Sequence, residues 1–168
     1  DEDYGELRAA LAEALQTEVE FFPVENYTAA TIALKQGNLE LALAGPSEYV
    51  IITSRTNAIP IVAVTRPNYY SVIAVPTGSP IETGADLKGK VIAMADIGST
   101  SGHLGPTKLL IDAGLDPQTD IEIRMLGDRG SIENLKQGRV DAWGGSAIDY
   151  KDFLQDADNS FPILVEGP

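Results

Sequence analysis

The chain has 168 residues, of which 25 are acidic and 12 are basic, so its formal net charge at neutral pH is −13. A strongly acidic chain is unsuited to binding nucleic acid or an anionic membrane surface, because both are held by clustered Lys and Arg. Cysteine is absent and histidine occurs once, at position 103, which excludes disulfides, zinc-thiolate sites and any site that needs two imidazoles.

Apolar spacing predicts helices alternating with short strands. In chain order these are a helix at 7–15, a strand at 19–22, a helix at 28–36, a strand at 39–44, a helix from residue 46, strands at 59–65, 70–75 and 91–95, a helix at 101–113, a strand at 121–126, a helix near 131–137, a strand at 139–143, a helix near 147–155 and a strand at 163–165. Such alternation indicates an α/β fold with mainly parallel sheets.

One segment of the chain is echoed 101 residues later. LKQGNLE at 34–40 returns as LKQGRVD at 135–141, and the likeness continues without a gap to Glu48-Tyr49 and Asp149-Tyr150. Two interpretations are open: a chance match of a common helix ending, or two lobes built on one plan. The Gly, Pro and Ser residues of 76–80 are typical of a linker between two such units.

We therefore predict lobe one at residues 1–76 and lobe two at 77–160, with 161–168 beginning a return crossover. The chain opens on a helix and ends on a strand that nothing completes. We expect both ends to be trimmed, with lobe one lacking its first strand and its return. No apolar run approaches the ~20 residues of a membrane span, and no signal peptide precedes Asp1, so an exported protein would be present in its mature form.

A cluster of hydroxyl residues follows the predicted strand at 91–95. Ser99, Thr100 and Ser101 stand between two glycines at the start of a predicted helix, with His103 in the same turn. Free backbone N–H groups and a partial positive charge at a helix N-terminus favour anions. The cluster thus predicts an oxyanion site built from uncharged donors, although Ser99 or Thr100 could simply be an N-cap.

Several other side chains are candidates for the same cleft. Tyr27 and Tyr69 stand where loops meet regular elements, so their hydroxyl groups could donate into a cleft. Trp143 could wall a pocket or belong to the core. The weaker candidates are Arg129, Asp149 and Tyr49.

The run at residues 98–104 resembles the phosphonate- and phosphite-binding periplasmic proteins of ABC importers. Segments 26–30, 45–50, 69–72 and 85–90 fit the same pattern, and the resemblance extends from about residue 6 to residue 164. It implies a two-lobed, type II periplasmic-binding fold, each lobe a mainly parallel sheet flanked by helices. It also implies an extracytoplasmic receptor that is monomeric, is not an enzyme, needs no metal or cofactor, and delivers a phosphonate, phosphite or phosphate to a membrane permease.

The resemblance further implies a set of ligand contacts. These are Ser99, Thr100, Ser101 and His103 from lobe two, with Tyr27 and Tyr69 from lobe one and the crossover. Aminoalkylphosphonate binders of the family carry a carboxylate near the position of Arg129, so this arginine predicts a ligand without an amino group. The alternatives are a receptor for another oxyanion such as a sulfonate, a sensor domain, and a small α/β hydrolase using Ser99 or Ser101 with His103.

Overall fold

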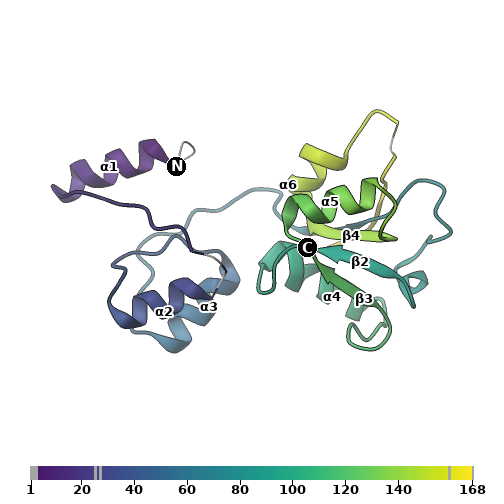
Figure 1. The fold of residues 1–168 in the computed structure, drawn as a ribbon, viewed down its shortest axis with the longest axis horizontal. Helices are drawn as coiled ribbons and strands as arrows, with labels where there is room; N and C mark the ends of the chain where they lie inside the picture. Colours follow the sequence, from purple (N-terminus) through teal and green to yellow (C-terminus); the bar gives the residue numbers. More distant parts are fainter. Residues whose placement is uncertain (1–3, 25, 27, 159, 168) are drawn as a thin grey trace.

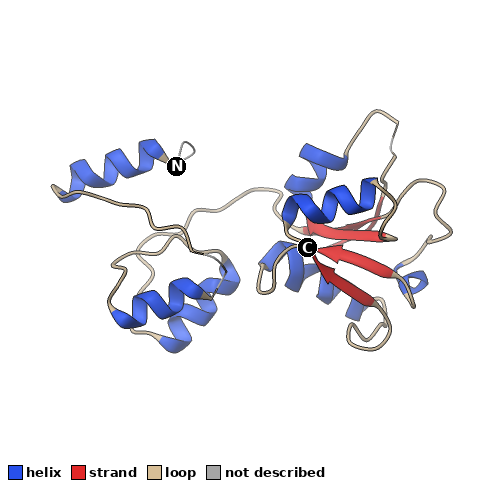
Figure 2. Cartoon of the chain, viewed as in Figure 1, coloured by secondary structure: helices blue, strands red, loops and turns tan. Residues whose placement is uncertain are grey.

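The computed structural model describes residues 4–24, 26, 28–158 and 160–167. Its elements are α1 (Gly5–Leu15), α2 (Ala29–Gln36), α3 (Pro46–Arg55), β1 (Ser71–Ala74), the 3₁₀-helix η1 (Gly84–Leu87), β2 (Val91–Met94), the π-helix η2 (Thr100–Leu104), α4 (Gly105–Asp112), β3 (Glu122–Met125), α5 (Asp128–Lys136), β4 (Ala142–Ser146), α6 (Ala147–Asp149), the π-helix η3 (Tyr150–Leu154) and β5 (Ile163–Glu166). Helices α1 to α3 lie on one side of the molecule, and the strands gather on the other (Figures 1 and 2). Among the described residues, no helix is long and apolar enough to cross a membrane.

Within the described residues the strands form one five-stranded sheet, in the order β3-β2-β4-β1-β5. Strand β2 pairs in parallel with β3 and β4, whereas β1 runs antiparallel to both β4 and β5. Parallel strands end at the same edge of a sheet, so the segments that follow β2, β3 and β4 meet there. The α/β class that the sequence predicts is confirmed.

Alternate residues of the strands pack on opposite faces of this sheet. Ile73 and Ile92 belong to the cluster that α4 and η1 cover, while Val72, Ala93 and Trp143 belong to the cluster under α5 and η3. Because side chains along a strand point to alternate faces, one short strand contributes to both layers of the core. The sheet is therefore buried on both sides, which explains the continuous apolar runs of the sequence.

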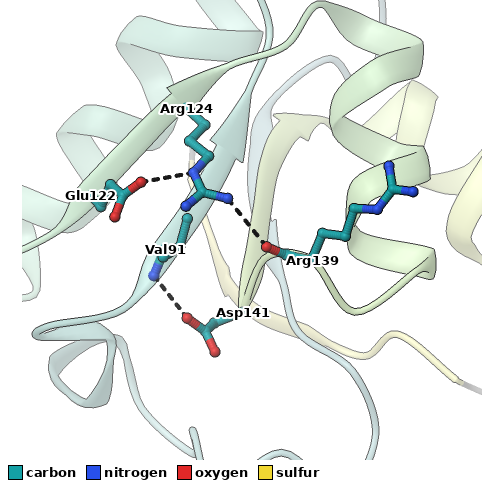
Figure 3. Close-up of polar contacts among 5 residues, drawn as sticks. All are labelled: Val91, Glu122, Arg124, Arg139 and Asp141. Carbon is teal, nitrogen blue, oxygen red and sulfur yellow. Dashed lines mark hydrogen bonds and ion pairs between the residues drawn. The ribbon is translucent and has the colours of Figure 1, made fainter.

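Polar contacts tie the strands together at the amino-terminal edge of the parallel part of the sheet (Figure 3). The Asp141 carboxylate accepts the backbone N–H of Val91 at 2.8 Å. Arg124 donates to Glu122 at 2.7 Å and to the carbonyl of Arg139 at 3.4 Å.

The strands predicted at 19–22, 39–44 and 59–65 are not formed, so the predicted sheet of lobe one is absent from the described residues. Several of their apolar side chains are exposed: Leu43 by 76%, Ile59 by 80% and Val64 by 84%. An apolar run becomes a strand only when another strand satisfies its N–H and C=O groups. The described residues around α2 and α3 provide no such partner.

The sheet also includes more of the chain than the predicted lobe two. Strand β1 lies between β4 and β5, so residues 71–74 and 163–166 share a sheet with β2 to β4. The predicted boundaries place β1 in lobe one and β5 in the return crossover. Antiparallel pairing across long loops leaves no local signature, so the spacing of apolar residues could not reveal it.

The echoed segments share their helix endings. Helix α2 is followed by Gly37 with φ 74°, and α5 is followed by Gly138 with φ 65°. A left-handed backbone conformation at a helix C-terminus costs glycine little free energy, because glycine has no Cβ atom. After Gly138 a turn leads into β4 at Ala142, three residues later than predicted, whereas the equivalent chain after Gly37 stays unpaired.

Candidate ligand-binding site

A polar pocket of about 230 Å³ opens at the carboxyl-terminal edge of the sheet. It is lined by Arg66, Tyr69, Ser99, Ser101, Asp128, Ser146, Ile148 and Asp149. The loop after β2 supplies the first two serines, the start of α5 supplies Asp128, and the end of β4 supplies Ser146. The topology therefore brings together residues that lie up to 83 positions apart, because the ends of the parallel strands and the start of the antiparallel strand β1 lie at the same edge.

Ser99 and Ser101 are each only 7% exposed, yet both line the pocket. The Ser99 Oγ accepts the N–H of Gly102 at 3.2 Å, which makes Ser99 the N-cap of η2. An accepting hydroxyl still has its own proton to donate. The N-cap role and the donor role thus coincide in one side chain.

Tyr69 reaches the pocket from the segment that precedes β1. Its hydroxyl lies 2.6 Å from the Ser101 Oγ, and the Arg66 guanidinium stacks 3.7 Å above its ring. Between them, Asn68 adopts a left-handed φ of 57°, which asparagine tolerates in turns. This turn places the Tyr69 phenol beside Ser101, with the Arg66 cation against its ring.

Two carboxylates, Asp128 and Asp149, face the same small pocket. The Ser146 hydroxyl donates to Asp149, whose backbone N–H donates to Ser146 at 3.0 Å. Partial burial raises the pKa of Asp128, and the nearby carboxylates of Asp149 and Asp96 raise it further. Since like charges oppose each other at close range, this wall of the pocket is suited to a cation.

Arg129 does not line the pocket, whereas its neighbour Asp128 does. Helix α5 begins at Asp128, and successive residues of a helix point about 100° apart. The Arg129 side chain is exposed. Arg129 therefore gives no support to the prediction of a ligand without an amino group, because the residue that lines the pocket carries the opposite charge.

Thr100 joins the loop after β2 to helix α3. Its Oγ1 accepts the Ser47 N–H at 3.0 Å and donates to the Ser47 Oγ at 2.8 Å. The Ser47 hydroxyl in turn donates to the Gly98 carbonyl at 2.6 Å. These three bonds, which we call the Ser47 latch, connect the helical part of the chain to the sheet directly beside the pocket.

Ser47→Ala is expected to weaken ligand binding about three- to tenfold, because the latch loses two hydroxyl hydrogen bonds worth about 0.5–1.5 kcal/mol each. Calorimetric titration gives the affinity, and small-angle scattering of the ligand-free variant should give a larger radius of gyration. Ser54→Ala, an exposed serine on the same helix, is the matched control. Equal affinity and equal compactness in both variants would contradict a role for the latch.

The remaining predicted residues lie elsewhere. The His103 Nδ1 accepts the Gly98 N–H at 3.1 Å, and its ring lines a separate hollow of about 400 Å³. Tyr49 is 46% exposed on α3 and does not line the pocket. Tyr27 lies outside the described residues.

In the described chain neither the Ser99 nor the Ser101 hydroxyl is hydrogen-bonded to the His103 ring: the Ser99 Oγ contacts Gly102 and the Ser101 Oγ contacts Tyr69. A serine nucleophile needs its base within hydrogen-bond reach. The described residues also hold no group of three or more His, Asp or Glu side chains placed to bind a metal ion.

Sequence reasoning missed Arg66, Asp128 and Ser146 in the pocket and Ser47 in the latch. Asp128 and Ser146 could have been found by the rule that identified Ser99, since each follows or ends a parallel strand. For Arg66 and Ser47 no local signal exists, because both come from the part of the chain outside the sheet.

Comparison with known proteins identifies the family of this chain. The family model of ABC transporter phosphonate periplasmic substrate-binding proteins matches residues 1–168. The chain belongs to this family.

Individual relatives point the same way. The phosphate-import protein PhnD of Mycolicibacterium smegmatis is 32% identical over 119 residues, which cover 67% of this chain and 37% of that protein. PhnD1 of Prochlorococcus marinus, solved in complex with methylphosphonate, is 21% identical with a TM-score of 0.76, covering 100% of this chain and 69% of that one. The aliphatic sulphonate binding protein SsuA of Escherichia coli is 25% identical with a TM-score of 0.66, covering 97% and 54%. The chain thus spans about a third of the length of the PhnD relative, and the predicted periplasmic-binding-protein fold is confirmed.

Proposed function

We propose that this protein is the extracytoplasmic receptor of an ABC importer and binds a small organophosphorus oxyanion in the pocket at the carboxyl-terminal edge of the sheet. The observation that carries the proposal is the convergence of three hydroxyl groups, on Ser99, Ser101 and Tyr69, in one small polar pocket. Hydroxyl donors next to a helix start stabilise a phosphonyl group without Lys. An acidic protein can hold an anion in this way.

The charged side chains that line the pocket indicate which further group the ligand carries. Asp128 and Asp149 would repel a bare anion, and Arg66 is the single cation among the residues that line the pocket. A ligand with an ammonium group a few bonds from its phosphonyl group would place each charge beside its complement. We therefore propose an aminoalkylphosphonate as the preferred ligand.

Transport would follow from closure of the two parts of the chain around the ligand. The Ser47 latch connects α3 to the loop that carries Ser99 and Ser101. A ligand bound by this loop would therefore favour the arrangement in which the latch is formed. A ligand shifts such an equilibrium by its differential affinity for the closed state. The closed receptor would then be recognised by the membrane permease, with no bond made or broken.

A calorimetric panel tests the ligand: 2-aminoethylphosphonate, methylphosphonate, phosphate, and taurine as the sulfonate counterpart. We expect 2-aminoethylphosphonate to bind about tenfold more tightly than methylphosphonate, because one charge-assisted hydrogen bond contributes about 1.5–3 kcal/mol. Asp128→Asn should abolish this preference, whereas Asp152→Asn, an exposed carboxylate of η3, should leave it unchanged. The preference should also grow as pH rises through the raised pKa of Asp128, since only the ionised carboxylate attracts an ammonium group.

The panel separates the two parts of the proposal. Tighter binding of methylphosphonate than of 2-aminoethylphosphonate would contradict the amino group proposed for the ligand, while the proposal of a phosphorus oxyanion would stand. Tighter binding of taurine than of every phosphorus compound would make the protein a sulfonate receptor. Binding of none would refute the receptor role of this pocket.

A further inference from the structure

Gly98 begins the loop that carries Ser99 and Ser101, and both its N–H and its carbonyl group are hydrogen-bonded. The Gly98 N–H donates to the His103 Nδ1 at 3.1 Å, and the Gly98 carbonyl accepts the Ser47 hydroxyl at 2.6 Å. Gly98 has a left-handed φ of 94°, a conformation that few other residues adopt. The hydrogen bond from Gly98 to His103 therefore closes the loop over residues 98–103, which contains both pocket serines.

This hydrogen bond requires one protonation state of the ring. An imidazole nitrogen accepts a hydrogen bond only while it carries a lone pair, so Nδ1 must be unprotonated and the proton must sit on Nε2. The imidazolium carries an N–H group at both ring nitrogens. Its Nδ1–H would face the Gly98 N–H, and two donors form no hydrogen bond. Burial lowers the pKa of His103 below its ordinary value of 6.5, which favours the accepting form at neutral pH.

We propose that His103 is a positioning residue for the oxyanion pocket: the neutral ring fixes Gly98, and so Ser99 and Ser101, while protonation of the ring releases the loop and weakens ligand binding. The proposal rests on the proposed function, because the serines act there as the oxyanion donors. His103 itself faces the hollow on the other side of the loop, with Thr107 and Ile111.

The sign of the pH dependence distinguishes positioning from direct contact. A histidine that touched the anion would strengthen binding when protonated, since an imidazolium attracts an oxyanion. A histidine that holds the loop weakens binding when protonated. The charged groups nearby are Asp116, which shares the hollow, and Asp96, which lies on the same loop and raises the pKa of Asp128.

The first experiment compares methylphosphonate affinity at about pH 7.5 and about pH 5.5 in wild type, His103→Ala and His103→Asn. The Asn Oδ1 can accept the Gly98 N–H at either pH, so His103→Asn should restore most of the affinity that His103→Ala loses. Between the two pH values wild type should lose about tenfold more affinity than His103→Asn. Titration of the ligand and of Asp128 affects both proteins alike and cancels in this comparison.

The second experiment needs no ligand. Because the chain has one histidine, its imidazole signal in a nuclear magnetic resonance titration is unambiguous. The Gly98 amide resonance should shift with the same midpoint, below pH 6.5. Independent titration of the two signals, superimposable pH profiles of wild type and His103→Asn, or a gain of wild-type affinity at low pH would each overturn the inference. A wild type that binds nothing at about pH 7.5 overturns the proposed function as well, whereas binding that ignores the His103 variants overturns this inference alone.

Discussion

Replacing Ser99 and Ser101 together by alanine is expected to weaken phosphonate binding about hundredfold. Both hydroxyl groups line the pocket, and each is positioned to donate to a charged oxygen. A hydrogen bond to a charged group contributes about 1.5–3 kcal/mol, and each 1.4 kcal/mol corresponds to a tenfold change in affinity. Calorimetric titration with methylphosphonate measures the loss, which should exceed that of either single variant.

The double variant must stay folded for this result to be informative. Ser99 also caps η2 through Gly102, and loss of an N-cap costs about 1 kcal/mol. Thermal unfolding followed by circular dichroism therefore accompanies the titration, with Ser54→Ala as the exposed-serine control. A folded double variant that binds within threefold of wild type would move the oxyanion site away from the loop after β2.

Trp143→Ala is expected to lower the free energy of unfolding by about 3–5 kcal/mol, the usual cost of deleting a large buried aromatic side chain. Trp143 is 2% exposed on β4, beside Ala74 of β1 and Ala93 of β2. Its Nε1 donates to the buried Ser131 Oγ at 3.0 Å. The substitution leaves a cavity between the sheet and α5. It also removes one hydrogen bond of the buried Ser131 hydroxyl, which keeps its bond to the Asp128 carbonyl at 2.8 Å.

Urea unfolding followed by circular dichroism measures this loss, since the variant has no tryptophan left to report fluorescence. Ser131→Ala is the matched control: it removes the hydrogen bonds to Trp143 and to the Asp128 carbonyl and keeps the ring, so it should cost only about 1–3 kcal/mol. A loss below about 1 kcal/mol for Trp143→Ala would show that the site collapses to fill the space. Trp143 does not line the pocket, so the folded variant should keep its ligand affinity.

The environment of Trp143 also shows why its place could not be read from the sequence. A tryptophan followed by Gly144 and Gly145 fits the wall of a pocket or the core equally well. In the structure a Cβ on Gly145 would stand 1.9 Å from the Trp143 ring, and one on Gly144 would stand 2.7 Å from Pro106. The glycines make room for packing within the core, and that requirement becomes visible only when the neighbouring elements are in place.

Local rules were sufficient wherever a feature depends on neighbours in the chain. The helices that end before Gly37 and Gly138, the α3 start at Pro46 and four of the five strands were predicted near their observed places. The hydroxyl cluster at the start of η2 was found for the same reason, because a strand followed by a glycine and three hydroxyl residues is a local pattern. The family resemblance at residues 98–104 rests on this pattern too.

Tertiary structure decided everything that depends on distant segments. It paired β1 with β4 and β5, left the apolar segments at 19–22, 39–44 and 59–65 unpaired, and chose Asp128 over Arg129 for the pocket. It also directed His103 away from the pocket and linked Ser47 to Thr100 across 53 residues. Strand pairing and the direction of a side chain depend on which backbones approach each other in space, and the order of residues along one segment does not contain that information.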